Sequence, residues 1–338
     1  LILIIKGIKL IKLAKPKKNK FSIVVAVYNR PEEMCELLES ILNQEFKDLE
    51  IIVVDDGSDK PSRDIVDHFK KELKIKYFYI ENRGPALARN YGVNKSEGEW
   101  IIFFDSDCTI PKNYFFEVNK YLENNKIDFF GGPDMMDKNF TYLQKSINFS
   151  MTSFLTTGGI RGGKNSIDKF LPRSFNMGIR KNAFDDVGGF SDMRQYGEDL
   201  DLSYKLLFSG KKSGLIVDAK VYHKRRTNLS NFFNQMLKSG KGRHFLNLKY
   251  AGTFRIFHLF PTFFILGFFI SNISFLSFQI EFINLFQMAY GLYFSLIFLI
   301  STLINFNPII GFLSLITTLI QFLGYGIGYV IGIFNNIK

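Results

Sequence analysis

Cysteines and glycine-rich phosphate loops are scarce in this sequence. Its 338 residues include 2 cysteines, Cys35 and Cys108. So few thiols provide neither a disulfide framework nor a thiolate metal site, and they are typical of a reducing compartment. The turn after the first apolar run reads VYNRPEE where a dinucleotide-binding fold has GxGxxG, and GxxxxGK[ST] does not occur. The sequence therefore disfavours a nicotinamide dinucleotide site and excludes a P-loop.

Charge is nearly missing from the end of the chain. Between residues 256 and 337 the only charged side chain is that of Glu281. Three apolar runs lie there, 256–278, 286–304 and 309–334. Each is close to the ~20 residues that a helix needs to cross a bilayer, so we expect a membrane domain of about three helices at 246–338. A hairpin of two spans plus a re-entrant segment stays open, because 324–332 is rich in glycine and Pro261 interrupts the first run.

Basic residues dominate the rest of the chain, which carries essentially all of the net charge of +11. Residues 1–20 contain seven lysines and no acid, interleaved with Leu and Ile. This pattern predicts an amphipathic helix in the headgroup plane, with a signal or transit segment as the alternative. Because the lysines gather here and just before the first apolar run, membrane lipids explain the charge better than nucleic acid, and they place the folded domain on the cytoplasmic side of the cell membrane.

Apolar runs of strand length alternate with helical patterns from residue 21 onward. The strands are expected at 21–28, 49–56, 75–80 and 99–105. Continuous apolar strands separated by helices predict a parallel sheet covered on both faces, a Rossmann-like α/β domain that we place at 21–245. Residues 140–180 lose the alternation and become rich in Gly, Ser, Thr and Asn. A helix at 199–208 and a short strand at 214–222 follow.

Polar residues follow each of the four predicted strands, at the edge where ligands bind in an open parallel sheet. Asp105 and Asp107 flank one residue at the end of the apolar WIIFFD strand, and alternation places both carboxylates on one side. Two such oxygen donors can hold Mg²⁺ or Mn²⁺, which would offset the charge on a departing nucleoside diphosphate. The alternative is a solvated turn, which a DxD tripeptide alone does not exclude.

Asp55 and Asp56 end the second predicted strand. A carboxylate at this depth can accept the N3 proton of a uracil ring, so both are candidate substrate-binding residues. The alternative is that Asp-Gly merely closes the strand with a turn.

Several strings together resemble the family 2 inverting glycosyltransferases of GT-A fold. They are SIVVAVYNRPEEMCELLESILNQEF, LEIIVVDDGSD, NRGPALARNYGVNKSEGEWIIFFDSD, FNMGIRKNAFDDVGGFSD and YGEDLDLSYKL. The resemblance covers about residues 20–245. It implies that Ala26, Tyr28, Asp56 and Arg89 line a nucleotide-sugar pocket, and that Asp105 and Asp107 hold metal and diphosphate.

Glu198 and Asp199 match the acidic motif of that family, whose second carboxylate serves as general base. Displacing a diphosphate from an anomeric carbon in one step requires the acceptor hydroxyl to lose its proton as it attacks, and a positioned carboxylate can take it. Inversion follows from that geometry. The alternative is an ordinary helix start, where the dipole favours acids.

Three further residues complete the predicted site. His223 follows a short strand at the place where relatives of this family bring a histidine to the metal or diphosphate, although a structural role is as well supported. Lys238 and Arg243 belong to NQMLKSGKGR, which resembles the Q-x-x-[KR]-x-G-x-G pattern of non-processive relatives. Their charges suit a diphosphate or anionic lipid.

The sequence therefore predicts a metal-dependent, inverting glycosyltransferase at the cytoplasmic membrane. The donor is expected to be a UDP-linked sugar and the acceptor a hydroxyl of a glycan or lipid-linked saccharide, in cell-surface polysaccharide synthesis. Three alternatives stay open. They are a polyprenyl-phosphate sugar transferase, a processive synthase, and a catalytically silent subunit of a polysaccharide-synthesis complex.

Overall fold

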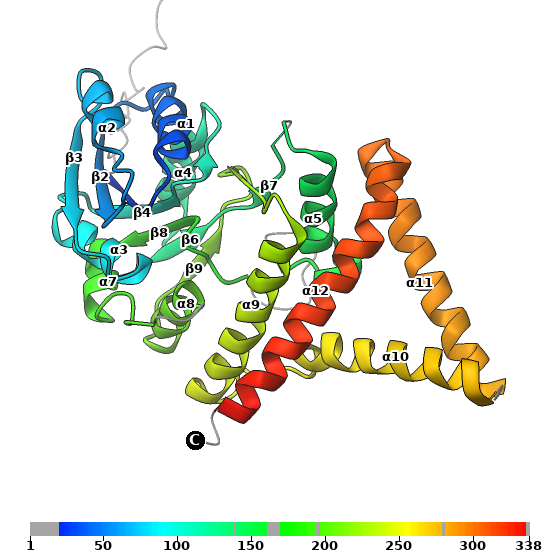
Figure 1. Ribbon diagram of the computed structural model, residues 1–338. Coiled ribbons are helices and arrows are strands. Elements are labelled where there is room, and N and C mark those ends of the chain that lie inside the picture. Colours follow the sequence, from blue (N-terminus) through cyan, green and yellow to red (C-terminus); the bar gives the residue numbers. More distant parts are fainter. Residues whose placement is uncertain (1–19, 138, 161–169, 194–196, 279–280, 336–338) are drawn as a thin grey trace, which may run out of the picture.

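The protein, as seen in a computed structural model, has an α/β part and a helical part (Figure 1). The structure describes residues 20–137, 139–160, 170–193, 197–278 and 281–335. The helix expected at 1–20 falls outside these residues, apart from Lys20, and stays a prediction.

A seven-stranded sheet forms the centre of the α/β part. Its strand order is β3 (Ile75–Ile80), β2 (Leu49–Asp56), β1 (Phe21–Val27), β4 (Trp100–Asp105), β8 (Asn176–Arg180), β6 (Phe129–Gly131) and β9 (Ser213–Leu215). The four strands predicted from the sequence are present and mutually parallel, which confirms the α/β fold class. β8 runs antiparallel to β4 and β6. It comes from the irregular stretch 140–180, where the sequence pattern gave no strand.

Helices cover both faces of this sheet because its strands are apolar on both sides. Alternate residues of β1 point to opposite faces, so that Ile23 packs in one core cluster and Val24 in the other. The first cluster includes residues of α1 (Pro31–Leu42), α2 (Arg63–Phe69) and α4 (Tyr114–Asn124). The second includes residues of α3 (Pro85–Asn94), α7 (Lys181–Asp186) and α8 (Glu198–Phe208). This rigid sandwich fixes the strand ends at which the site lies.

A small second sheet places a histidine beside the end of β4. Its order is β5 (Cys108–Thr109), β10 (Val221–His223) and β7 (Asp134–Met135). β10 is antiparallel to β5, with His223 directly opposite Cys108. Two residues more than 100 positions apart thereby become neighbours at the rim of the main sheet.

The helical part lies beside the α/β part (Figure 1); its first two helices come before β8 in the chain, and the rest of it comes after β10. It comprises α5 (Tyr142–Thr152), α6 (Phe154–Thr157), α9 (Leu229–Lys249), η1 (Ile256–Leu259), α10 (Phe260–Phe278), α11 (Glu281–Asn305) and α12 (Pro308–Asn335). The domain boundary predicted at 245/246 falls inside α9. Pro261 is the second residue of α10, a position that tolerates proline because no intrahelical N–H bond is needed there.

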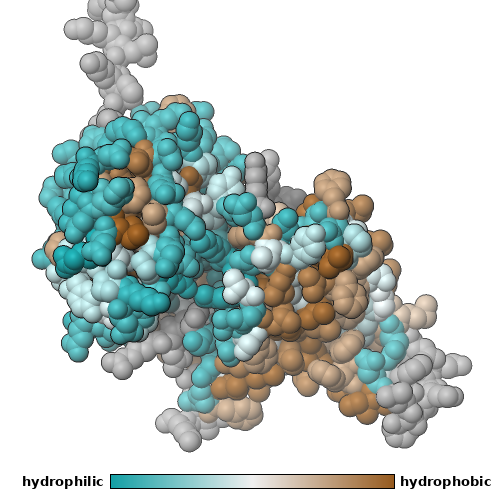
Figure 2. All heavy atoms as spheres, turned by 45° about the horizontal axis from the view of Figure 1, so that its top comes forward, coloured by the Kyte–Doolittle hydropathy of each residue, from teal (hydrophilic) through white to brown (hydrophobic). Residues whose placement is uncertain are grey.

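Three of these helices are long and apolar enough to cross a membrane: 256–273, 285–305 and 308–335. Their positions agree with the three apolar runs of the sequence. Figure 2 shows the apolar side chains gathered over this helical part, whereas the α/β part is mostly hydrophilic.

The last of the three helices differs from the other two in its surroundings. Half of its apolar window is buried inside the protein, against 17% and 11% for the first and second windows. It packs along α9, where a Cβ at Gly328 would lie 2.0 Å from the carbonyl oxygen of Leu237 and one at Gly240 would lie 2.1 Å from that of Tyr325. On α5, the Ser150 hydroxyl is 2.7 Å from that of Thr317. α12 is therefore held against α9 and α5.

Candidate active site

A cavity of about 1150 Å³ opens at the carboxyl ends of β1, β2 and β4 and continues between α9, α10 and α12. Among the residues predicted for the site, Asp55 and Lys238 do not line this cavity. The predicted residues that do line it are Ala26, Tyr28, Asp56, Arg89, Asp105, Asp107, Glu198, Asp199, His223 and Arg243. Side chains from distant parts of the sequence thus meet in one place, and their roles remain predictions.

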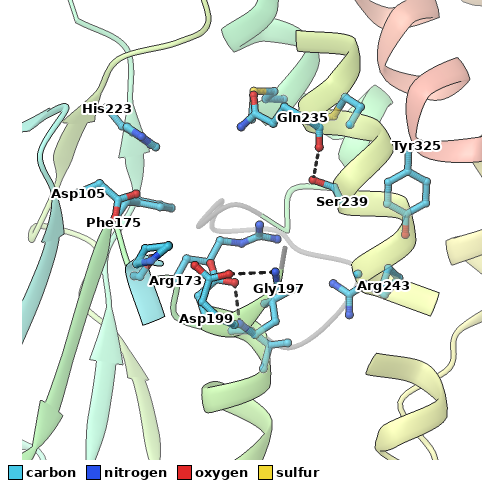
Figure 3. A pocket seen from close by; sticks show the side chains of 18 of the residues that line it. Asp105, Arg173, Phe175, Gly197, Asp199, His223, Gln235, Ser239, Arg243 and Tyr325 are labelled. Carbon is cyan, nitrogen blue, oxygen red and sulfur yellow. Dashed lines mark hydrogen bonds between the residues drawn. The ribbon is translucent and has the colours of Figure 1, made fainter. Parts of the chain in front are cut away.

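Asp107 lies between two basic side chains. Arg30 donates a hydrogen bond to its Oδ2, and His223 Nε2 is 3.2 Å from its Oδ1. Burial alone would raise the pKa of Asp107, but His223 and Arg30 outweigh burial and hold it well below its ordinary range. The ring of Phe175 stacks on His223 with centroids 5.1 Å apart, which fixes the imidazole (Figure 3). Asp107 is therefore a buried carboxylate in its ionised form.

The surroundings of Asp107 fit a divalent cation. Asp107, Cys108 and His223 bring three possible ligand atoms within 4.8 Å of one another. Among the described residues, the buried Nδ1 of His223 has no hydrogen-bond partner, and the buried Oδ1 of Asp107 has only the contact with His223 Nε2. Two ligands at an octahedral metal of Mg²⁺ size are about 3.0 Å apart, close to the 3.2 Å between Asp107 Oδ1 and His223 Nε2.

Cys108 is the member of this group that fits least. Its thiol contacts the carbonyl oxygen of Phe175 at 3.8 Å, and burial raises its pKa well above the usual value. A neutral thiol is a poor ligand for the hard cations that carboxylates prefer. Asp105, predicted as a metal ligand, is not a member of this group of three. The sequence analysis predicted Asp107 and His223 as metal ligands and counted the two cysteines, Cys108 included, against a thiolate metal site.

Arg89 connects the end of β4 to the start of α8. Its Nη2 donates to Asp105 Oδ1 at 2.7 Å and its Nη1 to Glu198 Oε1 at 3.2 Å. The guanidinium is buried and lies over the ring of Phe190, 5.5 Å from the centroid. Asp105 and Glu198 are thus held at a fixed separation by one rigid group.

Glu198 and Asp199 open α8. The helix follows Gly197, whose φ of +115° is a conformation that side chains other than glycine rarely adopt. Asp199 Oδ1 accepts a hydrogen bond from the Leu200 amide at 2.7 Å, and Glu198 Oε2 accepts one from the Gly197 amide at 3.2 Å (Figure 3). Burial and, secondly, the neighbouring Asp199 raise the pKa of Glu198, which Arg89 only partly opposes. The two acids therefore have different electrostatic environments.

Asp55 and Asp56 point to opposite faces of β2. Asp56 lines the cavity and accepts hydrogen bonds from the amides of Arg83 and Gly84, both at 2.9 Å. The carboxylate of Asp55 is buried and accepts from the amides of Ser58 and Ser62 and from the Tyr77 hydroxyl. Its contacts hold the loop after β2, as expected for the turn-forming alternative, and its substrate-binding role stays a prediction.

Several residues of the cavity were not among those predicted from the sequence. They include Arg30, Arg173, Gln321 and Tyr325. Arg30 could have been found, since it follows the first strand. Arg173 lies in the irregular stretch 140–180 and Gln321 in an apolar run, so neither had a sequence signal. Figure 3 shows Arg173 beside Asp199, with Asp105 and His223 on one side and Arg243 and Tyr325 on the other.

The sheet order and the acidic rim define a protein of GT-A fold, and comparison with known proteins agrees. The model of Glycosyl transferase family 2 matches residues 22–188. An uncharacterized glycosyltransferase of Haemophilus influenzae is 30% identical over 220 residues, which cover 62% of this chain and 70% of that protein. The chain belongs to glycosyltransferase family 2.

Other similarities cover different shares of each chain. An uncharacterized glycosyltransferase of Rickettsia bellii is 39% identical over 110 residues, 32% of this chain and 16% of that protein, so the match spans a small part of its length. The poly-beta-1,6-N-acetyl-D-glucosamine synthase of Staphylococcus epidermidis is 28% identical over 58% of this chain and 48% of its own. The structure of the mannosyltransferase PcManGT from Pyrobaculum calidifontis, in complex with GDP-Man and Mn²⁺, shares the fold with a TM-score of 0.63 and 14% identity, covering 90% of this chain and 88% of that one.

Proposed function

We propose that the protein transfers a sugar, with inversion, from a nucleoside-diphosphate donor to an acceptor hydroxyl. The observation that carries the proposal is that one cavity is lined both by the Asp107–His223 pair and by the Glu198–Asp199 pair. The first pair suits a cation with its bound diphosphate, and the second supplies a base. PcManGT, which shares the fold, was determined with GDP-Man and Mn²⁺, which supports a nucleotide-sugar donor and a divalent metal.

Asp199 is the proposed general base. Its Oδ1 accepts from the Leu200 amide, and among the described residues no group donates to its Oδ2, which is left for the acceptor. As the acceptor oxygen bonds to the anomeric carbon, its proton moves to Asp199 and the carbon–oxygen bond to the diphosphate breaks. Glu198 suits this role less because it is paired with Arg89.

Asp107 and His223 would hold Mn²⁺ or Mg²⁺, which when bound neutralises charge on the leaving diphosphate. Asp56 and Tyr28 line the cavity at the ends of β2 and β1, where a nucleoside ring is expected. With both oxygens of Asp56 already accepting from backbone amides, the carboxylate is fixed in place, and each oxygen keeps a second lone pair for the N3 proton of uracil. This arrangement supports UDP as the nucleotide.

The acceptor is proposed to be a glycan or lipid-linked saccharide in cell-surface polysaccharide synthesis. The three apolar helices support a multi-pass protein of the cell membrane, and the basic residues support a cytoplasmic catalytic domain. The similarity to the Staphylococcus epidermidis synthase supports a polysaccharide product.

The test is Asp199→Asn in the purified full chain, assayed for hydrolysis of UDP-sugars and transfer from them with Mn²⁺. Loss of a general base costs about 10²–10⁴-fold in rate, and UDP binding should be unchanged. Asp185→Asn, on an exposed part of α7, is the control for losing one negative charge. Full activity of Asp199→Asn would instead favour a polyprenyl-phosphate sugar transferase, whose phosphate acceptor needs no base. Absence of turnover by the wild-type protein with every donor would favour the silent subunit.

A further inference from the structure

The end of the cavity next to the apolar helices has a mixed wall. Arg243 and Tyr325 contribute polar groups from α9 and α12, and Arg173 lies between them and Asp199 (Figure 3). Apolar surface comes from Phe257 and Phe322, on η1 and α12. A sugar nucleotide alone has no use for such an apolar wall, so this end suits a second molecule with an anionic part and an apolar part.

Arg173 and Arg243 form a pair of like charges at this end. Among the described residues, no carboxylate lies within 4.0 Å of either guanidinium, although Asp199 attracts Arg173 from farther away. Burial, and secondly repulsion by Arg243, lower the pKa of Arg173. Arg243 donates a hydrogen bond to the Tyr204 hydroxyl at 3.0 Å, which is a neutral partner. Both side chains are half-buried, and two neighbouring cations with no carboxylate in contact are stabilised by an anionic ligand.

Gln321 adds an independent observation. It is 6% exposed, and among the described residues its Oε1 has no hydrogen-bond partner. It lines the cavity from α12, one of the three apolar helices. A buried polar side chain is costly unless it meets a polar partner. The hydroxyls of a saccharide would supply that partner.

We propose that this end of the cavity holds the phosphate of a lipid-linked acceptor between Arg173 and Arg243, with the hydrocarbon chain against Phe257 and Phe322. The proposal rests on the proposed glycosyl transfer, and it names the acceptor class. The acceptor hydroxyl then lies toward Asp199, which is next to Arg173 (Figure 3). The donor diphosphate is a weaker candidate for the arginine pair because Asp107 and His223, which suit it, lie across the cavity.

The experiment measures binding without any donor or turnover, so that it is independent of catalysis. The purified full chain in detergent is titrated with a polyprenyl phosphate, the polyprenol of equal length and inorganic phosphate, and retention is followed by native mass spectrometry. Binding of UDP with Mn²⁺ is measured in parallel. The variants are Arg173→Gln, Arg243→Gln and the double change, and the control is Lys241→Gln, which removes a charge from α9 outside the cavity.

We expect the lipid phosphate to bind at least tenfold more tightly than the polyprenol, and each arginine change to weaken it by about tenfold or more, as for loss of a charged hydrogen bond. Lys241→Gln should bind as the wild type does, and all variants should bind UDP normally. The proposal would be overturned if polyprenyl phosphate and polyprenol bound equally well, or if the double variant bound polyprenyl phosphate as the wild type does. The proposal would also fail if inorganic phosphate bound as tightly as the lipid phosphate. It would fail as well if the arginine variants lost binding of UDP but kept binding of the lipid phosphate. A chain that binds lipid phosphate selectively yet transfers no sugar would refute the proposed function and leave this site standing.

Discussion

Neighbouring residues at a strand end lie in different surroundings, as Asp55 and Asp56 show. The sequence analysis proposed both for substrate binding, but adjacent strand residues face opposite ways, so only one of them can line the cavity. For Asp105 and Asp107, one residue apart, the same rule placed both on the cavity side, where they lie. Arg173 was beyond prediction because it lies in a stretch without periodicity and reaches the site only through tertiary packing.

Metal binding is expected to depend on Asp107 and His223 and not on Cys108. Asp107→Asn and His223→Gln should each weaken Mn²⁺ binding by at least tenfold, since the first removes the charge of a proposed ligand and the second removes its ring nitrogen. Cys108→Ala should bind Mn²⁺ like the wild type, because the buried thiol is neutral and donates a weak hydrogen bond to the Phe175 carbonyl oxygen. Free Mn²⁺ can be followed by electron paramagnetic resonance. Weak binding by the Cys108 variant, at unchanged folding, would show that the thiol is a ligand.

Asp201 is expected to stabilise the fold through contacts between α8 and α9. Its buried carboxylate accepts from Lys249 Nζ at 2.5 Å, the Tyr250 hydroxyl at 2.8 Å and the Ser191 hydroxyl at 2.6 Å. Asp201→Asn should cost about 2–3 kcal/mol, because charged hydrogen bonds are lost but Lys249 is partly solvated. The melting temperature in detergent should fall by about 4–6 °C, whereas Asp185→Asn should leave it unchanged.

The pH dependence follows from the same contacts. Burial alone would raise the pKa of Asp201, but Lys249, Ser191 and Tyr250 outweigh burial and lower it. The stabilisation is therefore present above the unfolded-state pKa of about 3.9, and it is lost as the pH falls from there through the lower folded-state pKa. The difference in melting temperature between wild type and Asp201→Asn should shrink below about pH 4. A difference that stays constant down to the acid limit of folding would contradict this account.

At the scale of elements, the contact of α9 with α12 depends on glycines. Gly328→Ala would place a Cβ 2.0 Å from the carbonyl oxygen of Leu237, so the helices would have to separate. We expect a loss of about 1–3 kcal/mol, the usual cost of overpacking, seen as a lower melting temperature in detergent. Gly291→Ala is the matched control, since no atom lies within 4 Å of its added Cβ. It should be neutral or slightly stabilising, and equal destabilisation by both changes would contradict the packing argument.

Elements with strong local periodicity were predictable and those defined by distant partners were not. The four parallel strands and the three apolar helices follow from their own residues, and the structure confirms them. β8 has no such signal: its five residues, NMGIR, form a strand because β4 and β6 lie on either side. The single strand expected at 214–222 is wrong, because the structure has two short strands there, β9 and β10, which belong to different sheets. The pairing of β10 with β5 brings His223 to Asp107.

At the scale of the whole molecule, the surroundings of α12 bear on how the chain meets the membrane. If α10, α11 and α12 all crossed the membrane, the end of α12 would lie on the opposite side of the membrane from the catalytic domain. Yet α12 packs along α9, which carries Lys241, Arg243 and Lys249, and it contacts α5. Charged side chains along α9 are costly in a bilayer. This packing favours a hairpin of α10 and α11, with α12 held on the side of the α/β part.

Cysteine labelling in intact cells tests this topology. In a Cys35→Ser background, Lys71→Cys on the exposed turn after α2 and Asn335→Cys at the end of α12 would react with a membrane-impermeant maleimide only if they face outward. We expect neither to react until the cells are opened, because the proposed orientation puts the basic domain inside and the α12 packing returns the end of the helix to it. A permeant maleimide, which should label both, is the control. Labelling of Asn335→Cys alone would establish three spans. Labelling of Lys71→Cys would show the opposite orientation, with the catalytic domain outside the compartment where nucleotide sugars are made.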